Sequence, residues 1–344
     1  MKLITHTGGS RMTKPSTIYD VARLAGVSSA TVSRVLNEPN KVGEDKRKKV
    51  LDAIKELNFI PKADAVANAR KGYHKIGVIA PFFTQPSFME RLRGVAEVLA
   101  AMHYELVIYS IDSTEDLNSY LSTIITTVRV DGLILFCMNL EKEMLEMLKN
   151  ATFPVCFVES DLEGFDCVNI HNLLGGQKAA EYLYGLGCRH PGFIGEKSGL
   201  SYAVGATEDR FRGFNFYFAN QGIIIPQEHI WIGEFSYHQL DKGIKDFLSS
   251  KNKPDCVFCS SDLIAARFLH IARGMGIRIP EDIKLIGFDN IDISNYIGLS
   301  TVSQNLDMSG KAAAELVLAR IKEPGRPVVN MNLPLDIIER ETTR

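Results

Sequence analysis

A short stretch near the N-terminus, Ser28–Asn37, carries side chains that suit contact with base edges in duplex DNA. On a helix, its outward positions would be small or hydrogen-bonding, with one cation: Ser29, Ala30, Thr31, Ser33 and Arg34. Such side chains fit into a major groove, and an arginine can bind a guanine edge or a phosphate. The pattern predicts a DNA-contacting helix; the alternative is a purely structural helical hairpin.

The rest of the chain offers no comparable set for catalysis. The first predicted strand leads into Ala-Pro-Phe-Phe-Thr-Gln-Pro, not a glycine-rich phosphate turn, and no Walker loop, HExxH or GxSxG sequence occurs. Cys256 and Cys259 form a CxxC pair, but a strand would point them to opposite faces and no second ligand pair follows. His171, His190 and His270 lack partners at triad or ligand spacing. We expect no enzyme activity, no metal site and no cofactor.

Two short helices joined by a glycine turn are expected to position Ser28–Asn37. Thr17 and Asp20 form a capping box that begins the first helix, and Gly26 can adopt the left-handed conformation that ends it. Ser28 then caps the second helix. The side chains expected to face inward are Val21, Ala22, Leu24, Ala25, Val32, Val35 and Leu36. This arrangement is typical of a helix-turn-helix.

A third helix is predicted from Glu44 to about Asn58. The apolar side chains that would pack on the first two helices are Val50, Leu51, Ile54 and Leu57. Its basic run, residues 46–49, is either a solvated face or a contact with phosphate. The N-terminal domain is therefore expected to be all-α.

The charge of the chain is unevenly distributed. The 344 residues carry a formal net charge of −2, with 45% hydrophobic and 23% charged residues, as in ordinary globular proteins. Between residues 13 and 75, 13 Lys and Arg stand against 7 Asp and Glu, whereas residues 76–344 sum to −10. A basic head on an acidic body indicates that the head meets a polyanion.

The sequence carries no export or membrane signal. No apolar run approaches the roughly 18 residues of a membrane span. The first residues lack the apolar core of a secretion signal, and six cysteines are too few for a disulfide framework. We expect a cytoplasmic protein that does not bind membranes.

From residue 76 onward, short apolar runs alternate with amphipathic stretches. The predicted strands are Ile76–Ala80, Glu105–Ser110, Gly132–Phe136, Val155–Val158, Gly192–Ile194, Ile230–Ile232, Cys256–Cys259 and Lys284–Gly287. The predicted helices are Phe88–Met102, Leu117–Val128, Glu141–Lys149, Gly176–Leu186, Arg210–Gln221, Leu240–Leu248, Leu263–Met275 and Met308–Ile321. This alternation indicates parallel sheets in an α/β fold, and about 270 residues favour two lobes over one core.

Residues Thr17–Asn37, TIYDVARLAGVSSATVSRVLN, followed by ELNFIP at Glu56–Pro61, resemble the head of the lactose/galactose repressor (LacI/GalR) family of bacterial transcription regulators. The resemblance extends over residues 14–344, so Met12 is a candidate start and residues 1–12 are expected to be a disordered extension. It implies a helix-turn-helix domain (13–61), a hinge (62–74) and an effector-binding and dimerisation domain (75–344). The last resembles periplasmic binding proteins, with an N-lobe (about 75–171 and 305–332) and a C-lobe (about 172–304 and 333–344).

The hinge departs from the family pattern. Relatives place a leucine there that wedges into the minor groove, and the matching position here is Asn68. Because asparagine is a poor wedge, we expect either weaker operator bending or a greater reliance on major-groove and phosphate contacts. The expected DNA contacts are Thr17, Tyr19, Ser28, Ser29, Ala30, Thr31, Ser33, Arg34, Asn37 and Asn68.

The resemblance also implies an effector site between the lobes. Arg210 lies three residues before Gly213 in EDRFRGF, and Asp289 lies in GFDN, two family ligand positions. The full expected set is Phe88, Glu159, Arg210, Phe235, Ser261, Asp262, Asp289 and Gln304. Carboxylates and guanidinium groups bridge the vicinal hydroxyls of sugars, and an aromatic ring covers a sugar face. A sugar or sugar derivative is expected, and a nucleobase or nucleoside remains an alternative.

The family resemblance implies a homodimeric repressor of carbohydrate-utilisation genes that binds a pseudo-palindromic operator and is released by a sugar-like effector. Within the family, the alternatives are a regulator that needs a corepressor or a protein partner. A solute-binding protein would share the body, but the head and the missing export signal argue against it.

Overall fold

The computed structural model describes residues 16–37, 41–57, 59, 72–127, 129–197, 199–234 and 236–344. The chain divides into two compact units, Met1–His74 and Lys75–Arg344, here called the head and the body. The predicted extension (1–12), nearly all of the predicted hinge, including Asn68, and the predicted ligand contact Phe235 lie outside the described residues. Among the described helices, none is long and apolar enough to cross a bilayer.

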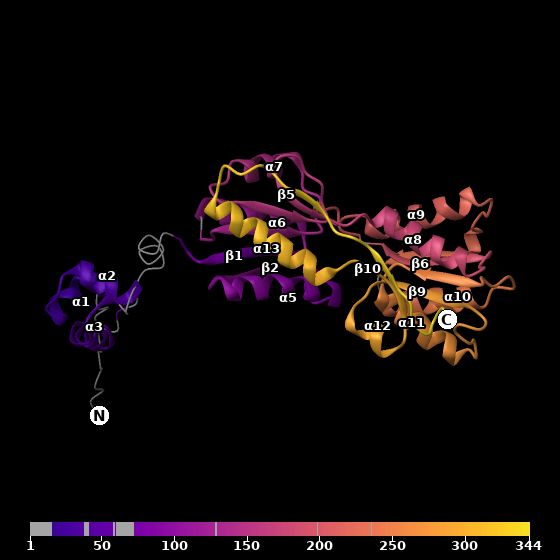
Figure 1. The fold of residues 1–344 in the computed structure, drawn as a ribbon, viewed down its shortest axis with the longest axis horizontal. Coiled ribbons are helices and arrows are strands. Elements are labelled where there is room, and N and C mark those ends of the chain that lie inside the picture. Colours follow the sequence, from indigo (N-terminus) through magenta and orange to yellow (C-terminus); the bar gives the residue numbers. More distant parts are fainter. Residues whose placement is uncertain are drawn as a thin grey trace, which may run out of the picture. The chain divides into compact units, whose positions relative to one another are not determined.

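The described residues of the head form three helices: α1 (Ile18–Ala25), α2 (Ser29–Asn37) and α3 (Glu44–Glu56) (Figure 1). Thr17 and Asp20 form the predicted capping box at the start of α1, and Gly26 ends the helix with φ of 64°. Val21, Val32 and Val50, one from each helix, are fully or almost fully buried in a common core. The helix-turn-helix prediction is confirmed.

Two apolar side chains predicted to face inward do not. Leu24 is 46% exposed and Leu51 is 50% exposed. Successive helical residues are rotated by about 100°, so Leu24 lies at the flank of the stripe that Val21 and Ala25 define. On α3, Ala53 takes the buried position that the sequence interpretation gave to Leu51.

The N-lobe of the body is built on a parallel six-stranded sheet in the order β11-β5-β4-β3-β1-β2. Its strands are β1 (Lys75–Pro81), β2 (Glu105–Ile111), β3 (Gly132–Phe136), β4 (Val155–Val158), β5 (Asp166–Asn169) and β11 (Asn330–Asn332). Its helices are α5 (Pro86–Ala101), α6 (Thr114–Thr127), α7 (Lys142–Lys149) and α13 (Leu306–Lys322). Helices α5 and α13 pack on one face and α6 and α7 on the other, which buries the apolar strands on both sides.

The C-lobe repeats this architecture around the sheet β12-β10-β9-β8-β6-β7, in which only β12 is antiparallel to its neighbour. Its strands are β6 (Pro191–Lys197), β7 (Ile230–Glu234), β8 (Cys256–Cys259), β9 (Lys284–Asp289), β10 (Ser300–Ser303) and β12 (Asp336–Ile338). Its helices are α8 (Asn172–Gly185), α9 (Ala206–Asn220), η2 (Gln227–His229), α10 (Tyr237–Leu248), α11 (Asp262–Gly274) and α12 (Asp292–Tyr296). Helices α8 and α9 cover one face and α10 and α11 the other.

The chain passes between the lobes three times: from β5 to α8, from β10 to α13 and from β11 to β12 (Figure 1). Parallel strands of both sheets therefore end at the junction of the lobes. Open α/β sheets bind ligands at such edges. The fold thus places a candidate site between the lobes.

Glycines bring one helix pair in each lobe into backbone contact. A Cβ at Gly310 on α13 would lie 2.0 Å from the carbonyl oxygen of Arg91 on α5. In the C-lobe, a Cβ at Gly176 on α8 would lie 1.9 Å from the carbonyl oxygen of Arg210 on α9. The helices that carry these two arginines are therefore held at fixed, close distances from their neighbours.

Candidate functional site

The outward face of α2 is the candidate DNA-contacting surface. Arg34 and Ala30 are exposed, and Ser29, Thr31 and Ser33 are half-buried. Of the other described positions in the predicted set, Thr17 and Ser28 are exposed, and Tyr19 is 72% exposed. Asn37 is the last residue of α2.

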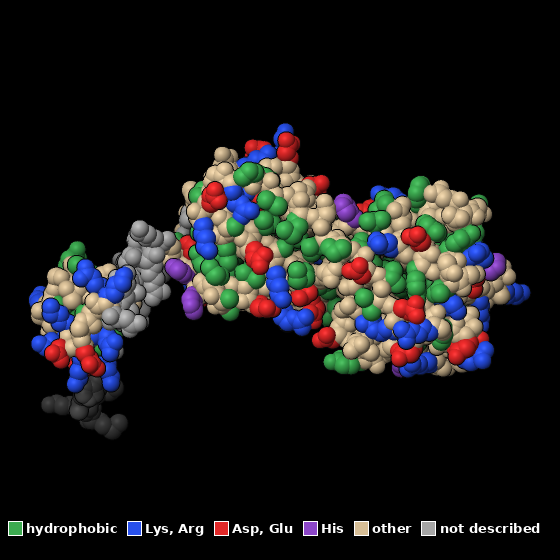
Figure 2. All heavy atoms as spheres, viewed as in Figure 1, with side chains coloured by type: hydrophobic (Ala, Val, Ile, Leu, Met, Phe, Trp, Pro, Cys, Tyr) green, Lys and Arg blue, Asp and Glu red, His purple; other side chains and the backbone are tan. Residues whose placement is uncertain are grey.

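The start of α2 is fixed by Ser28. Its hydroxyl oxygen accepts a hydrogen bond from the backbone N–H of Thr31 at 3.2 Å, and it contacts the Thr31 hydroxyl at 2.9 Å. Lys46, Lys48 and Lys49 on α3 are also exposed. Figure 2 shows Lys and Arg side chains over much of the visible face of the head, with fewer Asp and Glu. This surface suits a polyanion.

A cavity of about 500 Å³ lies between the lobes of the body. It is formed where parallel strands end. The lining residues near or directly after strand ends include Pro81 and Phe82 (β1), Cys137 (β3), Glu159 (β4), Glu196 and Lys197 (β6), Glu234 (β7), Asp289 (β9) and Gln304 (β10). Its volume is in the range of small-molecule sites.

Several cavity residues have strained backbones. The angle φ is 52° at Phe82, 53° at Cys137, 60° at Glu159 and 120° at Asp289. Residues with a Cβ rarely adopt positive φ, and such conformations cost about 1–3 kcal/mol each. They persist only where the surrounding structure fixes them, so the strand ends around this cavity are pre-organised.

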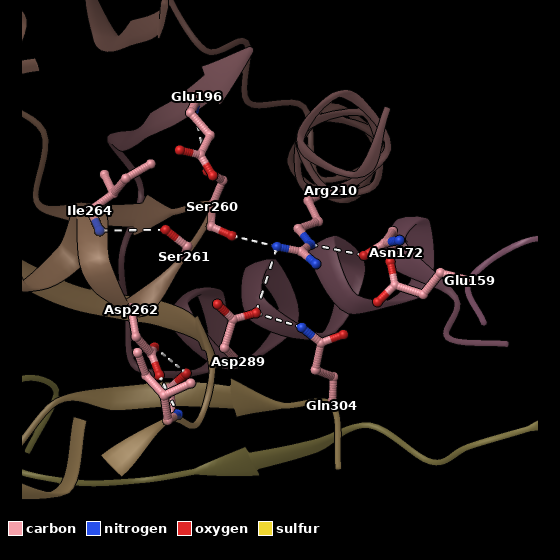
Figure 3. Close-up of polar contacts among 12 residues, drawn as sticks. Glu159, Asn172, Glu196, Arg210, Ser260, Ser261, Asp262, Ile264, Asp289 and Gln304 are labelled. Carbon is pink, nitrogen blue, oxygen red and sulfur yellow. Dashed lines mark hydrogen bonds and ion pairs between the residues drawn. The ribbon is translucent and has the colours of Figure 1, made fainter. Parts of the chain in front are cut away.

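A chain of polar contacts links the two lobes across the cavity. Arg91 forms an ion pair with Glu159, and their side chains are only 2% and 4% exposed. Arg91 also donates to Oε1 of Gln304 at 3.0 Å, and Gln304 donates from Nε2 to Oδ1 of Asp289 at 2.5 Å. Asp289 lies 3.9 Å from Nη1 of Arg210 (Figure 3). Arg91 and Glu159 belong to the N-lobe, whereas Asp289 and Arg210 belong to the C-lobe. These linked polar contacts therefore couple the positions of the two lobes.

Arg210 is held from several sides. Its Nε donates to Oδ1 of Asn172 at 2.8 Å, and its Nη1 donates to the carbonyl oxygen of Ser260 at 2.6 Å (Figure 3). Its guanidinium carbon lies 3.7 Å from the centroid of the Phe288 ring. These contacts fix the plane of the guanidinium group, which is the condition for geometric recognition of paired oxygen atoms.

Two carboxyl groups of the cavity favour protonation. Burial raises the pKa of Glu196 to about 7, and the nearby Asp289 carboxylate adds to this rise. Burial also raises the pKa of Asp289 to about 6, although Arg210 and Arg91 oppose it. None of the described residues donates a hydrogen bond to the Glu196 carboxyl group. Its oxygens are therefore available to hydroxyl donors of a ligand.

The structure brings six of the eight predicted ligand contacts to the cavity wall: Phe88, Glu159, Arg210, Ser261, Asp289 and Gln304. The hydroxyl of Ser261 is partly engaged, since it accepts from the backbone N–H of Ile264 at 3.4 Å and caps α11.

The assignment of Asp262 needs correction. Its side chain is fully buried and accepts hydrogen bonds from Thr301 Oγ1 at 2.6 Å and from the N–H of Ile291 at 3.0 Å. It braces β10 and the segment after β9, and it does not line the cavity.

The sequence interpretation missed Arg91 and Glu196. Arg91 falls on the same face of α5 as Phe88, Leu92 and Val95, all buried, so its spacing was a usable signal. Glu196 directly follows the buried residues of β6 and lies near the carboxyl end of that strand. A carboxylate at such a position is a candidate ligand contact.

Two family descriptions match the two units. Residues 17–62 match "Bacterial regulatory proteins, lacI family". Residues 180–343 match "Periplasmic binding protein-like domain".

Characterised relatives match almost the whole chain. The HTH-type transcriptional repressor PurR of Photobacterium profundum is 30% identical over 329 residues, which cover 94% of this chain and 97% of the relative. The HTH-type transcriptional regulator RegA of Clostridium saccharobutylicum is 32% identical over 332 residues, covering 95% and 99%.

Solved structures share the fold. A LacI-family transcriptional regulator from Silicibacter pomeroyi has a TM-score of 0.81 at 27% identity and covers 96% of this chain and 100% of its own. A regulator of the same family from Enterococcus faecium, with bound ribose, has a TM-score of 0.68 at 26% identity and covers 78% and 98%. The lac repressor dimer bound to operator and the anti-inducer ONPF resembles this chain in fold, with a TM-score of 0.78 at 24% identity and coverage of 96% and 99%.

A helix-turn-helix head followed by a two-lobed, periplasmic-binding-protein-like α/β body defines a class of bacterial transcription regulators. The chain belongs to the LacI family of bacterial regulatory proteins and is a DNA-binding transcription regulator.

Proposed function

We propose that this regulator is a homodimeric, cytoplasmic repressor of carbohydrate-utilisation genes and that a neutral sugar bound between its lobes releases it from a pseudo-palindromic operator. The observation that carries the proposal is the polar chain from Glu159 and Arg91 through Gln304 to Asp289 and Arg210. A ligand that contacts these linked polar side chains contacts both lobes at once. Its binding energy can therefore favour one arrangement of the lobes over another.

The exposed face of α2 supports the role in DNA binding. On the described part of the head, the predicted contacts to bases and phosphates are Ser29, Ala30, Thr31, Ser33, Arg34 and Asn37 of α2, with Thr17, Tyr19 and Ser28. One such helix reads only a few base pairs, so a useful operator requires two heads related by two-fold symmetry. For this reason we propose that the chain acts as a homodimer, with half-sites about one helical turn apart.

The composition of the cavity wall favours a sugar over a nucleobase. Aligned carboxylate, guanidinium and amide groups bind vicinal hydroxyls. Phe88 and Phe82 meet edge to face, with an interplanar angle of 71°, so they do not form two parallel walls around a planar base. The ribose-bound relative from Enterococcus faecium is consistent with this choice.

The charges of the cavity favour a neutral sugar over a sugar acid or sugar phosphate. Its described acidic residues are Glu159, Glu196, Glu208, Glu234 and Asp289, and its basic residues are Arg91, Lys197 and Arg210. Arg91 is paired with Glu159, and Arg210 is occupied by Asn172 and Ser260. An added anion would face an excess of carboxylates.

The proposal includes no enzyme activity. The thiol of Cys137 lines the cavity, but burial raises its pKa to about 12, so it is not a nucleophile at neutral pH. The carboxylate of Glu159 contacts this thiol and helps to raise the pKa of Cys137, but Glu159 is already paired with Arg91. A ligand bound here would be held and released unchanged.

The proposal is tested by measuring operator affinity, by fluorescence anisotropy, on a fragment selected from genomic DNA. The effectors are matched compounds: a neutral pentose or hexose, its acid, its phosphate and a nucleoside. We expect a neutral sugar to release the DNA. Arg210→Ala and Asp289→Ala should bind the operator as the wild type does and lose the release, whereas Lys197→Ala, at an exposed position of the wall, should keep it.

Two outcomes would contradict the proposal. Tighter operator binding on addition of sugar would make the ligand a corepressor and reverse the sign of the response. Release by a nucleoside or a phosphorylated sugar, but not by neutral sugars, would show that the charge argument is wrong.

A further inference from the structure

A second cluster of ligating side chains lies in the C-lobe. Among the described residues, the thiols of Cys188 and Cys256 and the carboxylate of Asp255 bring their ligand atoms within 4.8 Å of one another. Cys188 lies between α8 and β6, whereas Asp255 and Cys256 lie at the start of β8. They gather at the amino ends of these strands. The effector cavity lies at the carboxyl ends.

The cysteine pair that stands out in the sequence is a different one, Cys256 and Cys259, at which no metal site is expected. Cys256 and Cys259 do face opposite sides of β8, since Cys256 packs in the core under α8 and α9 and Cys259 in the core under α10 and α11. Instead, Cys256 meets Cys188, which is far from it in sequence. The parallel pairing of β6 and β8 brings the two together.

The third ligand is already oriented. The Asp255 carboxylate accepts hydrogen bonds from the backbone N–H of Arg189 at 2.6 Å and from that of His190 at 3.0 Å. Its own N–H donates to the carbonyl oxygen of His190 at 2.9 Å. Metal-binding carboxylates are commonly fixed by such outer hydrogen bonds. The loop that carries Cys188 is thereby tied to the strand that carries Cys256.

Two cationic side chains, Arg189 and Lys284, lie beside the cluster. The Arg189 side chain is fixed nearby, because it donates to the carbonyl oxygen of Cys188 at 2.8 Å and stacks 3.8 Å from the Tyr184 ring. Cationic neighbours partly balance two thiolates and a carboxylate around a divalent ion.

We propose that Cys188, Cys256 and Asp255 bind a thiophilic divalent metal ion of the zinc type, with water as the fourth ligand. In a tetrahedral zinc site the sulfur atoms lie about 3.8 Å apart, so the cluster needs to contract by at most about 1 Å. Cys256 is fully buried and Cys188 is 4% exposed, whereas Asp255 is half-buried and offers the side from which ion and water enter. The bound ion would cross-link the end of α8 to β8.

The test is a titration of the full-length chain, reduced with a phosphine, with Co²⁺ and then Zn²⁺. We expect one Co²⁺ per chain, with the absorption of tetrahedral cobalt and a sulfur-to-cobalt charge-transfer band, both removed by Zn²⁺. Zn²⁺ should raise the thermal midpoint by several degrees, because the ion binds the native state. Cys188→Ser and Cys188→Ala should weaken Co²⁺ binding by at least about 100-fold, more than the loss of an outer hydrogen bond does.

Cys259→Ser is the matched control, since it replaces an equally buried cysteine on the other face of the same strand. It should bind Co²⁺ as the wild type does. The thermal midpoint of each metal-free variant shows whether it is folded. Absence of the charge-transfer band in folded wild-type protein, equal loss of the band in Cys259→Ser, or formation of a Cys188–Cys256 disulfide without ion binding would overturn the proposal.

Discussion

Replacement of Glu196 by glutamine should stabilise the protein at alkaline pH and leave its stability unchanged at acidic pH. The pKa of Glu196 rises from its ordinary 4.5 to about 7 in the folded chain, chiefly because the carboxyl group is buried. Between these two values the folded state binds a proton that the unfolded state does not, so stability falls as pH increases through this window. This rise in pKa corresponds to about 3 kcal/mol of folding stability, which is lost in full only above pH 7.

The assay is thermal unfolding of wild type and Glu196→Gln between pH 5 and pH 8. Glutamine resembles the protonated acid in shape, so the two proteins should unfold together at pH 5. At pH 8 the variant should unfold at a temperature higher by about 5 °C. Glu234→Gln, at an exposed carboxylate on the same cavity wall, should show no such divergence. Equal midpoints of wild type and Glu196→Gln at both pH values would refute the assignment of Glu196 as a half-buried acid with a raised pKa.

Two further substitutions test the framework of the site. Gly310→Ala places a Cβ 2.0 Å from the carbonyl oxygen of Arg91 and should destabilise the protein by about 3 kcal/mol in urea unfolding, whereas Gly274→Ala, which adds its Cβ in open space, should be neutral or stabilising. Equal effects of the two would contradict the close helix contact. Asp262→Ala leaves the Thr301 hydroxyl and the Ile291 N–H without their acceptor and should cost about 1–3 kcal/mol, with effector affinity unchanged in calorimetric titration. A loss of effector affinity without a loss of stability would restore Asp262 as a ligand contact.

The regular elements were largely predictable because their apolar patterns are local. All eight predicted strands and all eight predicted helices of the body are present, with ends shifted by a few residues. The strands that were missed are β5, β10, β11 and β12. Strand β5 begins with Asp166, whose buried carboxylate accepts two hydrogen bonds from Arg320, at 2.6 and 2.7 Å, and one from the backbone N–H of Val329 at 2.9 Å. No local pattern reveals a partner more than 150 positions away.

Strand β10 shows the same limit. Its sequence, Ser-Thr-Val-Ser, reads as a loop, yet all four residues are buried. The Ser300 hydroxyl contacts Thr343 Oγ1 at 2.6 Å, and its backbone N–H donates to Thr342 Oγ1 at 2.9 Å. The polar groups of Ser300 are satisfied by the end of the chain, which sequence periodicity does not encode.

Four of the five residues that link the lobes, Glu159, Gln304, Asp289 and Arg210, could be named from family resemblance, but their coupling could not. Arg210, Asp289 and Gln304 were predicted one at a time. Arg91, which joins them to Glu159, has the sequence context of a surface helix charge and is recognised only by its face. Asp262 was wrongly assigned to the cavity for a related reason: neighbouring residues near a strand end point in different directions, and sequence position alone does not show which.

We infer that α2 reads DNA from two heads related by two-fold symmetry. The most direct test is selection of genomic fragments by the full-length chain, beside the variant Arg34→Ala. The wild type should enrich fragments that share an inverted repeat with half-sites about one helical turn apart, and Arg34→Ala should bind them with about 10- to 100-fold lower affinity. Retained fragments without a common inverted repeat, or equal affinity of the variant, would contradict this inference.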